Sequence, residues 1–184
     1  FHVGYYCDEF ALVNPKPCPT GRYSTSLKAK SSGVCQECPS GKTSLPGSRE
    51  CSCPLGYFAS SDDVCSPCAI GSYRAILDPT QGCNDCLKGK YSDVSGTAIC
   101  FDCAIGKYAD MTGAVECLTC PDGKSSFEEG STECENCPDG YFGLNGMCEI
   151  CPAGRYNANE GMAFCRICDA GSISSEGSLS CTSC

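Results

Sequence analysis

Hydrophobic positions along this chain never gather into the pattern of a long helix or strand. No stretch has the length of a membrane helix, no helical period is sustained, and no linker separates two halves of different composition. What recurs instead is an aromatic residue that begins a short extended run between glycine and cysteine, as in Gly106-Lys107-Tyr108. This pattern predicts many short hairpins and little or no helix.

The pattern belongs to a repeat that is marked by Cys-x-x-Cys pairs. Counted on the second cysteine, the pairs follow one another in steps of 14 to 20 residues. A glycine comes three positions later in all ten full units, and an aromatic residue comes two positions after that glycine in seven of them. We expect residues 1–17 to be a partial or irregular N-terminal unit. Residues 18–184 are expected to be a tandem array of ten short cysteine-rich repeats that ends at the opening cysteine of a further unit.

The residue types of the repeat each predict a local backbone structure. In Cys-Pro-x-Gly, proline fixes φ and glycine supplies the positive φ of a type II turn. A second turn, as in Gly130-Ser131-Thr132-Glu133-Cys134, returns the chain and gives a two-stranded ribbon of three or four residues a side. Such repeats contact only their neighbours, with the aromatic residues packed between them. We therefore expect a small, disulfide-rich fold, an extended rod or ladder of about ten stacked short β-hairpin modules.

Composition explains why cysteine has to hold this fold. The chain has 22 cysteines and no tryptophan, and Leu, Ile, Val and Phe together number only 29 of 184 residues. Ordering one residue costs roughly 1–2 kcal/mol of backbone entropy, which so few large apolar side chains cannot offset by burial. One disulfide that closes about 15 residues contributes on the order of 3 kcal/mol. Covalent closure is the expected substitute for a hydrophobic core.

Two other uses of Cys-x-x-Cys compete with structural disulfides. Pairs that follow one another at this spacing also suit tetrathiolate zinc sites. However, zinc sites take four ligands each, so 22 cysteines leave two over, and the even spacing does not mark which pairs would share an ion. Redox dithiols work singly at a helix N-terminus, and no helical pattern follows any pair. Disulfides in an oxidising compartment are favoured, and no metal, cofactor or catalytic site is expected.

Closure of each repeat on itself predicts a specific set of disulfides, because every loop then holds between 10 and 16 residues. A crossed scheme, with Cys35 joined to Cys51, is the alternative. The uncrossed pairs are Cys18 with Cys35, Cys38 with Cys51, Cys53 with Cys65, Cys68 with Cys83, Cys86 with Cys100, Cys103 with Cys117, Cys120 with Cys134, Cys137 with Cys148, Cys151 with Cys165 and Cys168 with Cys181.

Cys7 and Cys184 are left over in this scheme. They are candidates for an inter-unit or intermolecular bond. In one interpretation the chain is the ordered part of a larger polypeptide, and Cys184 closes a loop beyond it. In the other, Cys7 of one copy meets Cys184 of the next and forms a head-to-tail fibre.

The segment Cys35-Gln36-Glu37-Cys38-Pro39-Ser40-Gly41, followed by Cys51-Ser52-Cys53-Pro54-Leu55-Gly56, resembles the cysteine-rich, EGF-like region of ephrin receptors. The shorter repeats resemble ephrin-receptor-like repeats in long arrays of protist surface proteins, and the one-disulfide modules of tumour-necrosis-factor receptors. The resemblance covers residues 18–184 and implies an extracellular location and disulfides within units. The unit is repeated ten times here and no recognisable ligand-binding or kinase domain accompanies it, so ephrin binding is not carried over.

The charged and polar residues argue against two classes of function, nucleic-acid binding and catalysis. The net charge of −9, with 13 scattered Lys and Arg residues, argues against nucleic acid, and no nucleophile, base and orienting group recur together as in an enzyme. There is no membrane segment. The leading interpretation is an extracellular structural protein, secreted or on a cell surface, that forms a rigid stalk or filament subunit. Its partners would be neighbouring copies or flanking repeats, and turns such as Ser24-Thr25-Ser26 are candidates for O-linked glycans.

The alternative is a cell-surface receptor or adhesion ectodomain whose repeats bind a protein ligand. A spacer should have interchangeable repeats, whereas a binder should show one or two irregular repeats with an exposed apolar patch. Irregularity is concentrated between Cys7 and Cys35 and around Cys51-Ser52-Cys53.

Overall fold

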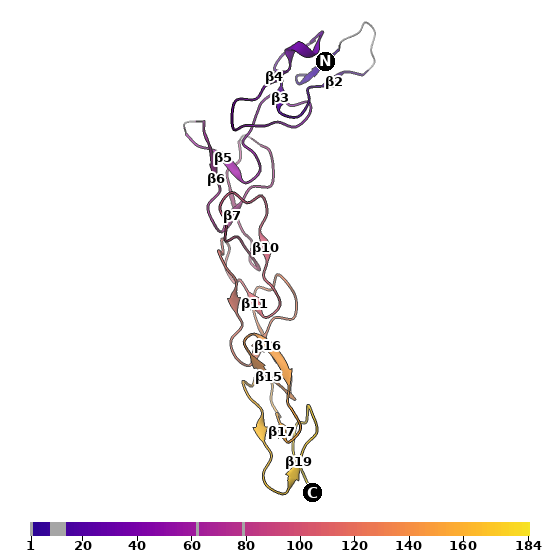
Figure 1. Cartoon of the computed structure of the whole chain (residues 1–184), viewed down its shortest axis with the longest axis vertical. Coiled ribbons are helices and arrows are strands. Elements are labelled where there is room, and N and C mark those ends of the chain that lie inside the picture. The colour runs from indigo at the N-terminus through magenta and orange to yellow at the C-terminus, as the bar shows by residue number, and fades with distance from the viewer. Residues whose placement is uncertain (1, 8–13, 62, 79) are drawn as a thin grey trace. The chain divides into compact units, whose positions relative to one another are not determined.

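The computed structural model describes residues 2–7, 14–61, 63–78 and 80–184. The chain divides into two compact units, one made of Phe1–Asn84 with Val94–Ile99 and the other of Asp85–Asp93 with Cys100–Cys184. Each unit is a succession of two-stranded hairpins, which Figure 1 traces along the chain. The expected boundary between residues 17 and 18 concerns the repeats rather than these two units, and it stays a prediction.

The described residues form ten two-stranded sheets and one short 3₁₀ helix, η1 (Ser32–Val34). The sheets pair β1 (Tyr5–Tyr6) with β2 (Lys16–Pro17), β3 (Arg22–Tyr23) with β4 (Gln36–Glu37), β5 (Tyr57–Ala59) with β6 (Cys65–Pro67), β7 (Ser72–Tyr73) with β8 (Asn84–Asp85), β9 (Lys90–Tyr91) with β10 (Phe101–Asp102), β11 (Lys107–Tyr108) with β12 (Leu118–Thr119), β13 (Lys124–Ser125) with β14 (Glu135–Asn136), β15 (Tyr141–Leu144) with β16 (Met147–Ile150), β17 (Arg155–Tyr156) with β18 (Arg166–Ile167) and β19 (Ser172–Ile173) with β20 (Thr182–Ser183).

The predicted fold class is confirmed: the chain is a small, disulfide-rich ladder of hairpin modules with almost no helix. The predicted strand length is wrong for most hairpins. Strands of three or four residues were expected, yet most strands have two, and only β5–β6 and β15–β16 are longer. Strands stop early because the residue that follows bonds to the next repeat: after Tyr108, the amide of Ala109 donates to the carbonyl of Ser131 at 3.2 Å.

The first turn of each repeat forms as its sequence predicts. In the repeat opened by Cys120, the amide of Lys124 donates to the carbonyl of Pro121 at 3.0 Å, which closes a four-residue turn. Gly123 is the third residue of this turn and has φ of +84°. Such a conformation strains any residue with a Cβ, so glycine is required here.

Successive repeats are joined by a recurring set of backbone hydrogen bonds. The amide of Cys120 donates to the carbonyl of Gly106 at 2.9 Å, and the amide of Gly106 donates to the carbonyl of Ser126 at 3.1 Å. The second turn contributes a further bond, from the amide of Gly130 to the carbonyl of Cys103 at 2.8 Å. Equivalent bonds recur through both units, so the polar backbone of each short hairpin is satisfied by its neighbour.

Repeats also contact the repeat after next, which corrects the expectation that only neighbours touch. A Cβ built on Gly123 would lie 2.1 Å from the carbonyl oxygen of Gly161, two repeats further along. The same close approach joins Gly89 to Gly130, at 1.9 Å. Each repeat is so short that its second turn reaches past the adjoining hairpin. Glycine at both positions lets the two backbones meet.

The core of the ladder consists of cysteines and small polar side chains. Most of the opening cysteines are buried, as are Ser44, Ser126 and Asn157 at the third position after the turn glycine. The hydroxyl of Ser126 donates to the carbonyl of Lys107 at 2.9 Å, and Ser44 makes the equivalent bond to Arg22 at 2.8 Å. These side chains tie each repeat to the one before. The aromatic residues that were expected to pack between repeats are half-buried.

The ladder is interrupted where one residue is missing between cysteines, at Cys51-Ser52-Cys53. Only a single bridge, Thr43 with Ser52, forms where other repeats have a hairpin. A Cβ on Gly41 would meet nothing within 4 Å, so its partner two repeats on is lacking. The sequence irregularity noted at this point therefore corresponds to a structural one.

Arg74 occupies the position of the buried serine in the repeat beyond this interruption. Its side chain is 1% exposed, and it donates to the carbonyls of Tyr57, Cys53 and Asp78. Its Nε has no partner among the described residues. A buried guanidinium that satisfies three carbonyls replaces the single hydroxyl bond found in regular repeats, and it fastens the loop that contains Asp78.

Replacing Arg74 by methionine keeps an unbranched apolar stem and removes all of the side chain's donors. Because one buried and two half-buried carbonyls lose this donor, we expect a cost of about 3 kcal/mol or more in local stability. Amide hydrogen exchange at Tyr57 and its neighbours would measure it. The control is Arg166→Met at an exposed position of β18, which should change exchange very little. Equal protection in the two variants would contradict this role.

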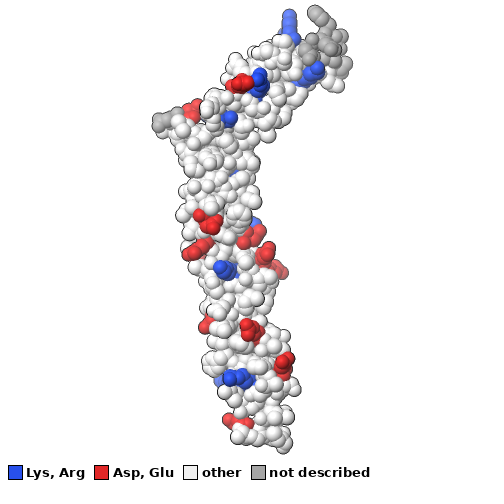
Figure 2. Space-filling view, in the orientation of Figure 1, with Lys and Arg blue, Asp and Glu red and all other residues white. Residues whose placement is uncertain are grey.

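The surface carries scattered charge. On the face drawn in Figure 2, basic and acidic side chains lie singly or in small groups among uncharged residues. In the part of the chain that the structure describes, no helix has the length and apolar character needed to cross a membrane.

Candidate functional site

The cysteines lie where closed repeats would place them. The structure joins ten pairs, 11 to 17 residues apart in sequence, with Cα–Cα distances of 5.5 to 5.8 Å. These pairs are the ten of the uncrossed scheme. They are Cys18–Cys35, Cys38–Cys51, Cys53–Cys65, Cys68–Cys83, Cys86–Cys100, Cys103–Cys117, Cys120–Cys134, Cys137–Cys148, Cys151–Cys165 and Cys168–Cys181.

Cys7 and Cys184 are unpaired. Cys7 is half-buried and follows β1 at the position where other repeats carry the buried serine, with its amide donating to the carbonyl of Ala29 at 2.9 Å. Cys184 is exposed, and its amide donates to the carbonyl of Gly171 at 3.0 Å, as the opening cysteine of a repeat does. A head-to-tail bond between the two stays a prediction.

A groove between successive repeats of the second unit is the best candidate for a binding site. We call it the Tyr108 groove, and its volume is about 510 Å³. This falls within the range of roughly 300–1,000 Å³ that is usual for ligand sites. The residues that line it are Lys88, Tyr108, Asp110, Pro121, Lys124, Thr132, Glu133 and Cys134.

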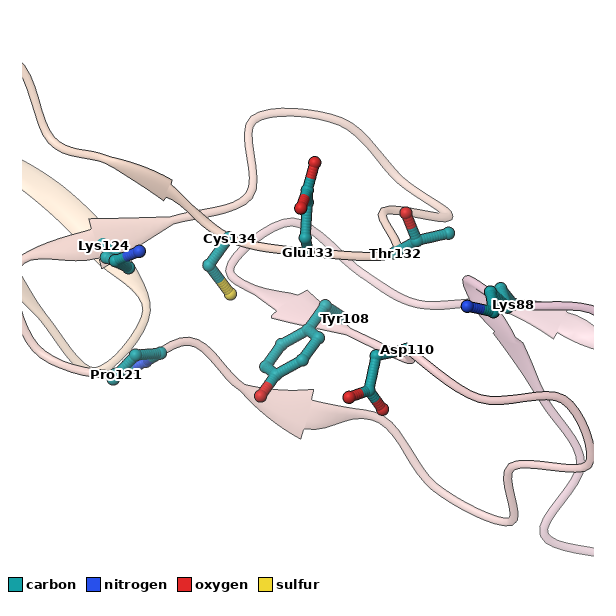
Figure 3. Close-up of a pocket in the computed structure, with 8 residues that line it drawn as sticks. All are labelled: Lys88, Tyr108, Asp110, Pro121, Lys124, Thr132, Glu133 and Cys134. Atoms are coloured by element: carbon teal, nitrogen blue, oxygen red, sulfur yellow. The ribbon is translucent and has the colours of Figure 1, made fainter.

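Strand ends and turns place these side chains around the groove. Tyr108 ends β11, and Asp110 follows two residues later. Lys124 begins β13, and Glu133 belongs to the second turn of the same repeat. Figure 3 shows the Tyr108 ring beside Asp110, and Glu133 on a neighbouring segment with its carboxylate pointing away from both. The repeat geometry thus brings residues from three consecutive repeats, with Lys88 from the first, to one place.

The charged side chains of the Tyr108 groove have no partners within the protein. Among the described residues, Lys88, Asp110, Lys124 and Glu133 form neither an ion pair nor a side-chain hydrogen bond. Figure 3 places the two lysines toward opposite ends of the groove. Elsewhere in the chain, exposed charges do pair, as Lys90 does with Asp102 at 2.5 Å. The groove therefore carries side chains of both charge signs that have no partner within the protein.

An apolar hollow adjoins the groove. It has a volume of about 260 Å³, is lined along residues 109–118, and shares Asp110 with the Tyr108 groove. Its large apolar side chains are Met111, Val115 and Leu118, each more than 40% exposed. Most of the residues that line this hollow belong to the loop closed by Cys103 and Cys117.

The structure offers no site for a metal ion in the residues it describes. No three His, Cys, Asp or Glu side chains gather there as ligands would. The cysteines that a zinc site would use are joined to one another instead.

Asp78 forms hydrogen bonds with Thr80 in the loop between β7 and β8. Its Oδ1 accepts from the hydroxyl of Thr80 at 2.6 Å and from the amide of Thr80 at 2.8 Å. These bonds, with a smaller contribution from Arg74, lower the pKa of the Asp78 carboxyl below its usual value of 3.8. Hydrogen bonds to the charged form favour ionisation.

The depressed pKa predicts a small effect of acid on this loop. The stabilising contribution is present above the unfolded-state pKa of about 3.9 and is lost as pH falls through the lower folded-state pKa. An NMR titration of the Asp78 carboxyl should give a pKa under the usual value. In Thr80→Val, which removes the hydroxyl, that pKa should rise. An Asp78 that titrates normally in the unmodified chain would refute the prediction.

Sequence reasoning noted tyrosine at this repeat position but did not distinguish Tyr108 from the others. Asp110, Lys124 and Lys88 are charged residues of ordinary surface turns, and no motif links them. Their convergence depends on how consecutive repeats stack, which the spacing of cysteines does not specify. The one available signal was that Tyr108 lies within a regular stretch of equal 17-residue steps.

Comparison with known families agrees with the resemblance seen in the sequence. Residues 89–137 match the family model described as "Tyrosine-protein kinase ephrin type A/B receptor-like". No curated protein sequence gives a significant match to the chain. The match and the ten disulfides support a cysteine-rich repeat array of the ephrin-receptor-like type and an extracellular setting. The matched segment contains every residue of the Tyr108 groove except Lys88.

Proposed function

We propose that this array of ephrin-receptor-like repeats is part of a receptor or adhesion ectodomain and that some of its repeats bind a protein ligand outside the cell. The observation that carries the proposal is the Tyr108 groove with its adjoining apolar hollow, inside the segment that matches the receptor family model. A spacer has no need of unpaired charge around a hollow, whereas a recognition surface does.

This proposal differs from the leading interpretation of the sequence, a rigid stalk or filament subunit. That role stays a prediction, and the family match favours the receptor-type alternative. The expectation for a binder was an exposed apolar patch in a distinctive repeat. The exposed side chains of Met111, Val115 and Leu118 fit this expectation, although the repeat that carries them is regular in sequence.

The test is direct binding by the oxidised chain. The full chain would be immobilised and exposed to a panel of purified extracellular domains, with the reduced and alkylated chain as the control. The proposal expects saturable binding of at least one domain, lost on reduction because the groove depends on the disulfides. Filaments in electron micrographs, together with no binding across the panel, would favour the structural role and contradict the proposal.

A further inference from the structure

We propose that a pocket at the interruption of the ladder binds one carboxylate group, held by the buried guanidinium of Arg74 and the ammonium group of Lys42. The pocket includes Cys51-Ser52-Cys53 in its lining and has a volume of about 250 Å³. Its lining residues lie between Lys42 and Arg74, within the first compact unit and outside the segment that matches the receptor family model. The proposal therefore does not rest on the Tyr108 groove or on the receptor role.

Arg74, which lines this pocket, has N–H donors that the protein does not use. Arginine carries five N–H donors. Nη1 donates to the carbonyls of Cys53 and Tyr57, and Nη2 donates to the carbonyl of Asp78. Nε is buried and has no partner among the described residues, and these bonds account for only one of the two N–H groups of Nη2. Nε and Nη2 form one edge of the planar guanidinium, and such an edge can bind both oxygens of a carboxylate.

The charge of Arg74 has no counterion inside the pocket. The side chain is 1% exposed, and its acceptors are backbone carbonyls. Its charge acts on the carboxylate of Asp78, but that carboxylate accepts from Thr80 and does not line the pocket. A buried charge without a paired opposite charge costs free energy. A bound carboxylate would supply the missing negative charge.

Lys42 supplies the second cationic group. Its side chain is 13% exposed, and Nζ donates to Oδ1 of Asp63 at 2.6 Å. An ammonium group has three N–H donors, so this ion pair leaves two for a ligand. Lys42 and Asp63 both line the pocket. The ion pair therefore keeps the ammonium group beside the pocket with donors that a carboxylate can use.

The charges around the pocket favour a singly charged ligand. Glu50 and Asp63 line it, and each is paired with a basic side chain, Glu50 with Arg49 at 3.4 Å and Asp63 with Lys42. These two pairs and Arg74 together leave one net positive charge. A carboxylate balances that charge, whereas a doubly charged anion such as sulfate brings a second negative charge close to Glu50 and Asp63.

The pocket lies where the regular pattern of the ladder fails. A single residue separates Cys51 from Cys53, and only the bridge between Thr43 and Ser52 forms there. Arg74 occupies the position at which regular repeats bury a small polar side chain. Irregularity at this point of the sequence was the feature expected of a binding repeat. The missing hairpin and the long buried side chain together distinguish this place from the rest of the ladder.

Binding of acetate to the full oxidised chain tests the proposal. The NMR signal of the Arg74 Nε–H group reports on the unpartnered donor, and chloride at equal ionic strength is the control. Because the chain has a net charge of −9, general attraction of anions is not expected. Acetate should shift this signal saturably and bind more tightly than sulfate. A signal that acetate leaves unchanged would show that the donor meets water only. That result, or tighter binding of sulfate, would overturn the proposal.

Variants of the ion pair assign the effect to the pocket. Lys42→Gln removes a donor and should weaken acetate binding about tenfold. Lys107→Gln makes the same change of charge at an exposed position of β11, in the other compact unit, and should leave binding unchanged. Asp63→Asn removes the acidic group that competes for Lys42, at a φ of +59° that asparagine tolerates, and should strengthen binding. Equal binding by the two lysine variants, or weaker binding by Asp63→Asn, would refute the site.

Two peptides distinguish the sources of the carboxylate. One is acetylated and amidated with a single glutamate flanked by glycine and serine, and the other has glutamine in its place. Binding of the glutamate peptide at least as tight as that of acetate, and lost with glutamine, would identify an acidic side chain of a partner protein as the ligand. Binding of acetate without binding of the glutamate peptide would identify a small free carboxylate. If both peptides shifted the Arg74 signal equally, charge would not matter and the proposal would fail.

Discussion

Gly89→Ala is expected to unfold the hairpins around it. Gly89 has φ of +78°, and a Cβ there would lie 1.9 Å from the carbonyl oxygen of Gly130, two repeats along. The left-handed conformation costs a residue with a Cβ about 1–2 kcal/mol, and forcing the two backbones apart adds about 1–3 kcal/mol. Amide hydrogen exchange of the repeats that contain Gly89 and Gly130 would measure the loss, which we expect to total about 2–5 kcal/mol.

Gly154→Ala is the matched control. Gly154 occupies the same turn position with φ of +81°, but a Cβ there would meet nothing within 4 Å. Only the cost of the left-handed conformation should appear, so the change should be about 1–2 kcal/mol. A similar loss of protection in the two variants would mean that the contact between repeats two apart is not important for stability.

Removal of the disulfide between Cys103 and Cys117, by changing both cysteines to serine, is the second large effect. This disulfide closes a loop with a sequence separation of 14 residues, for which the chain-entropy model gives about 3 kcal/mol. Cys103 is also fully buried, so serine would place a hydroxyl in the core of the ladder. We expect loss of exchange protection in this repeat and in the hairpins next to it.

One control variant and one further consequence test this prediction. Cys7→Ser removes a thiol without removing a disulfide, so stability should stay nearly unchanged. The apolar hollow lined along residues 109–118 should also be lost in the double serine variant. Retention of full protection around Tyr108 after both cysteines are removed would show that backbone hydrogen bonds alone hold the repeat.

The sequence was sufficient to predict the module but not how modules stack. Proline and glycine in Cys-Pro-x-Gly each determine one backbone angle, so the turn at Gly123 could be expected from local chemistry. The approach of Gly123 to Gly161 could not, because it depends on the twist accumulated over two repeats. The third position after the turn glycine is a further example, because only the structure shows that Ser126 at this position donates to the carbonyl of Lys107.

The structural consequences of the irregular sequence positions could not be predicted from the sequence either. The missing residue in Cys51-Ser52-Cys53 was evident, but its consequence is the loss of a hairpin and of the partner of Gly41. Nothing in the sequence distinguishes Arg74 from the other scattered basic residues, and arginine is seldom fully buried. Its burial depends on three carbonyls that converge at the serine position of that repeat. The Tyr108 groove is likewise a product of stacking, which no single repeat encodes.

The central claim is that each repeat is closed by its own disulfide, and it is tested most directly by mapping the disulfides of the unreduced protein. Proteolysis under acidic conditions, followed by mass spectrometry of the linked peptides, would identify the pairs. The account predicts the ten uncrossed pairs, each 11 to 17 residues apart, with Cys18 joined to Cys35 and Cys38 joined to Cys51. Peptides that join Cys35 to Cys51, or many alkylated cysteines in the unreduced protein, would contradict it.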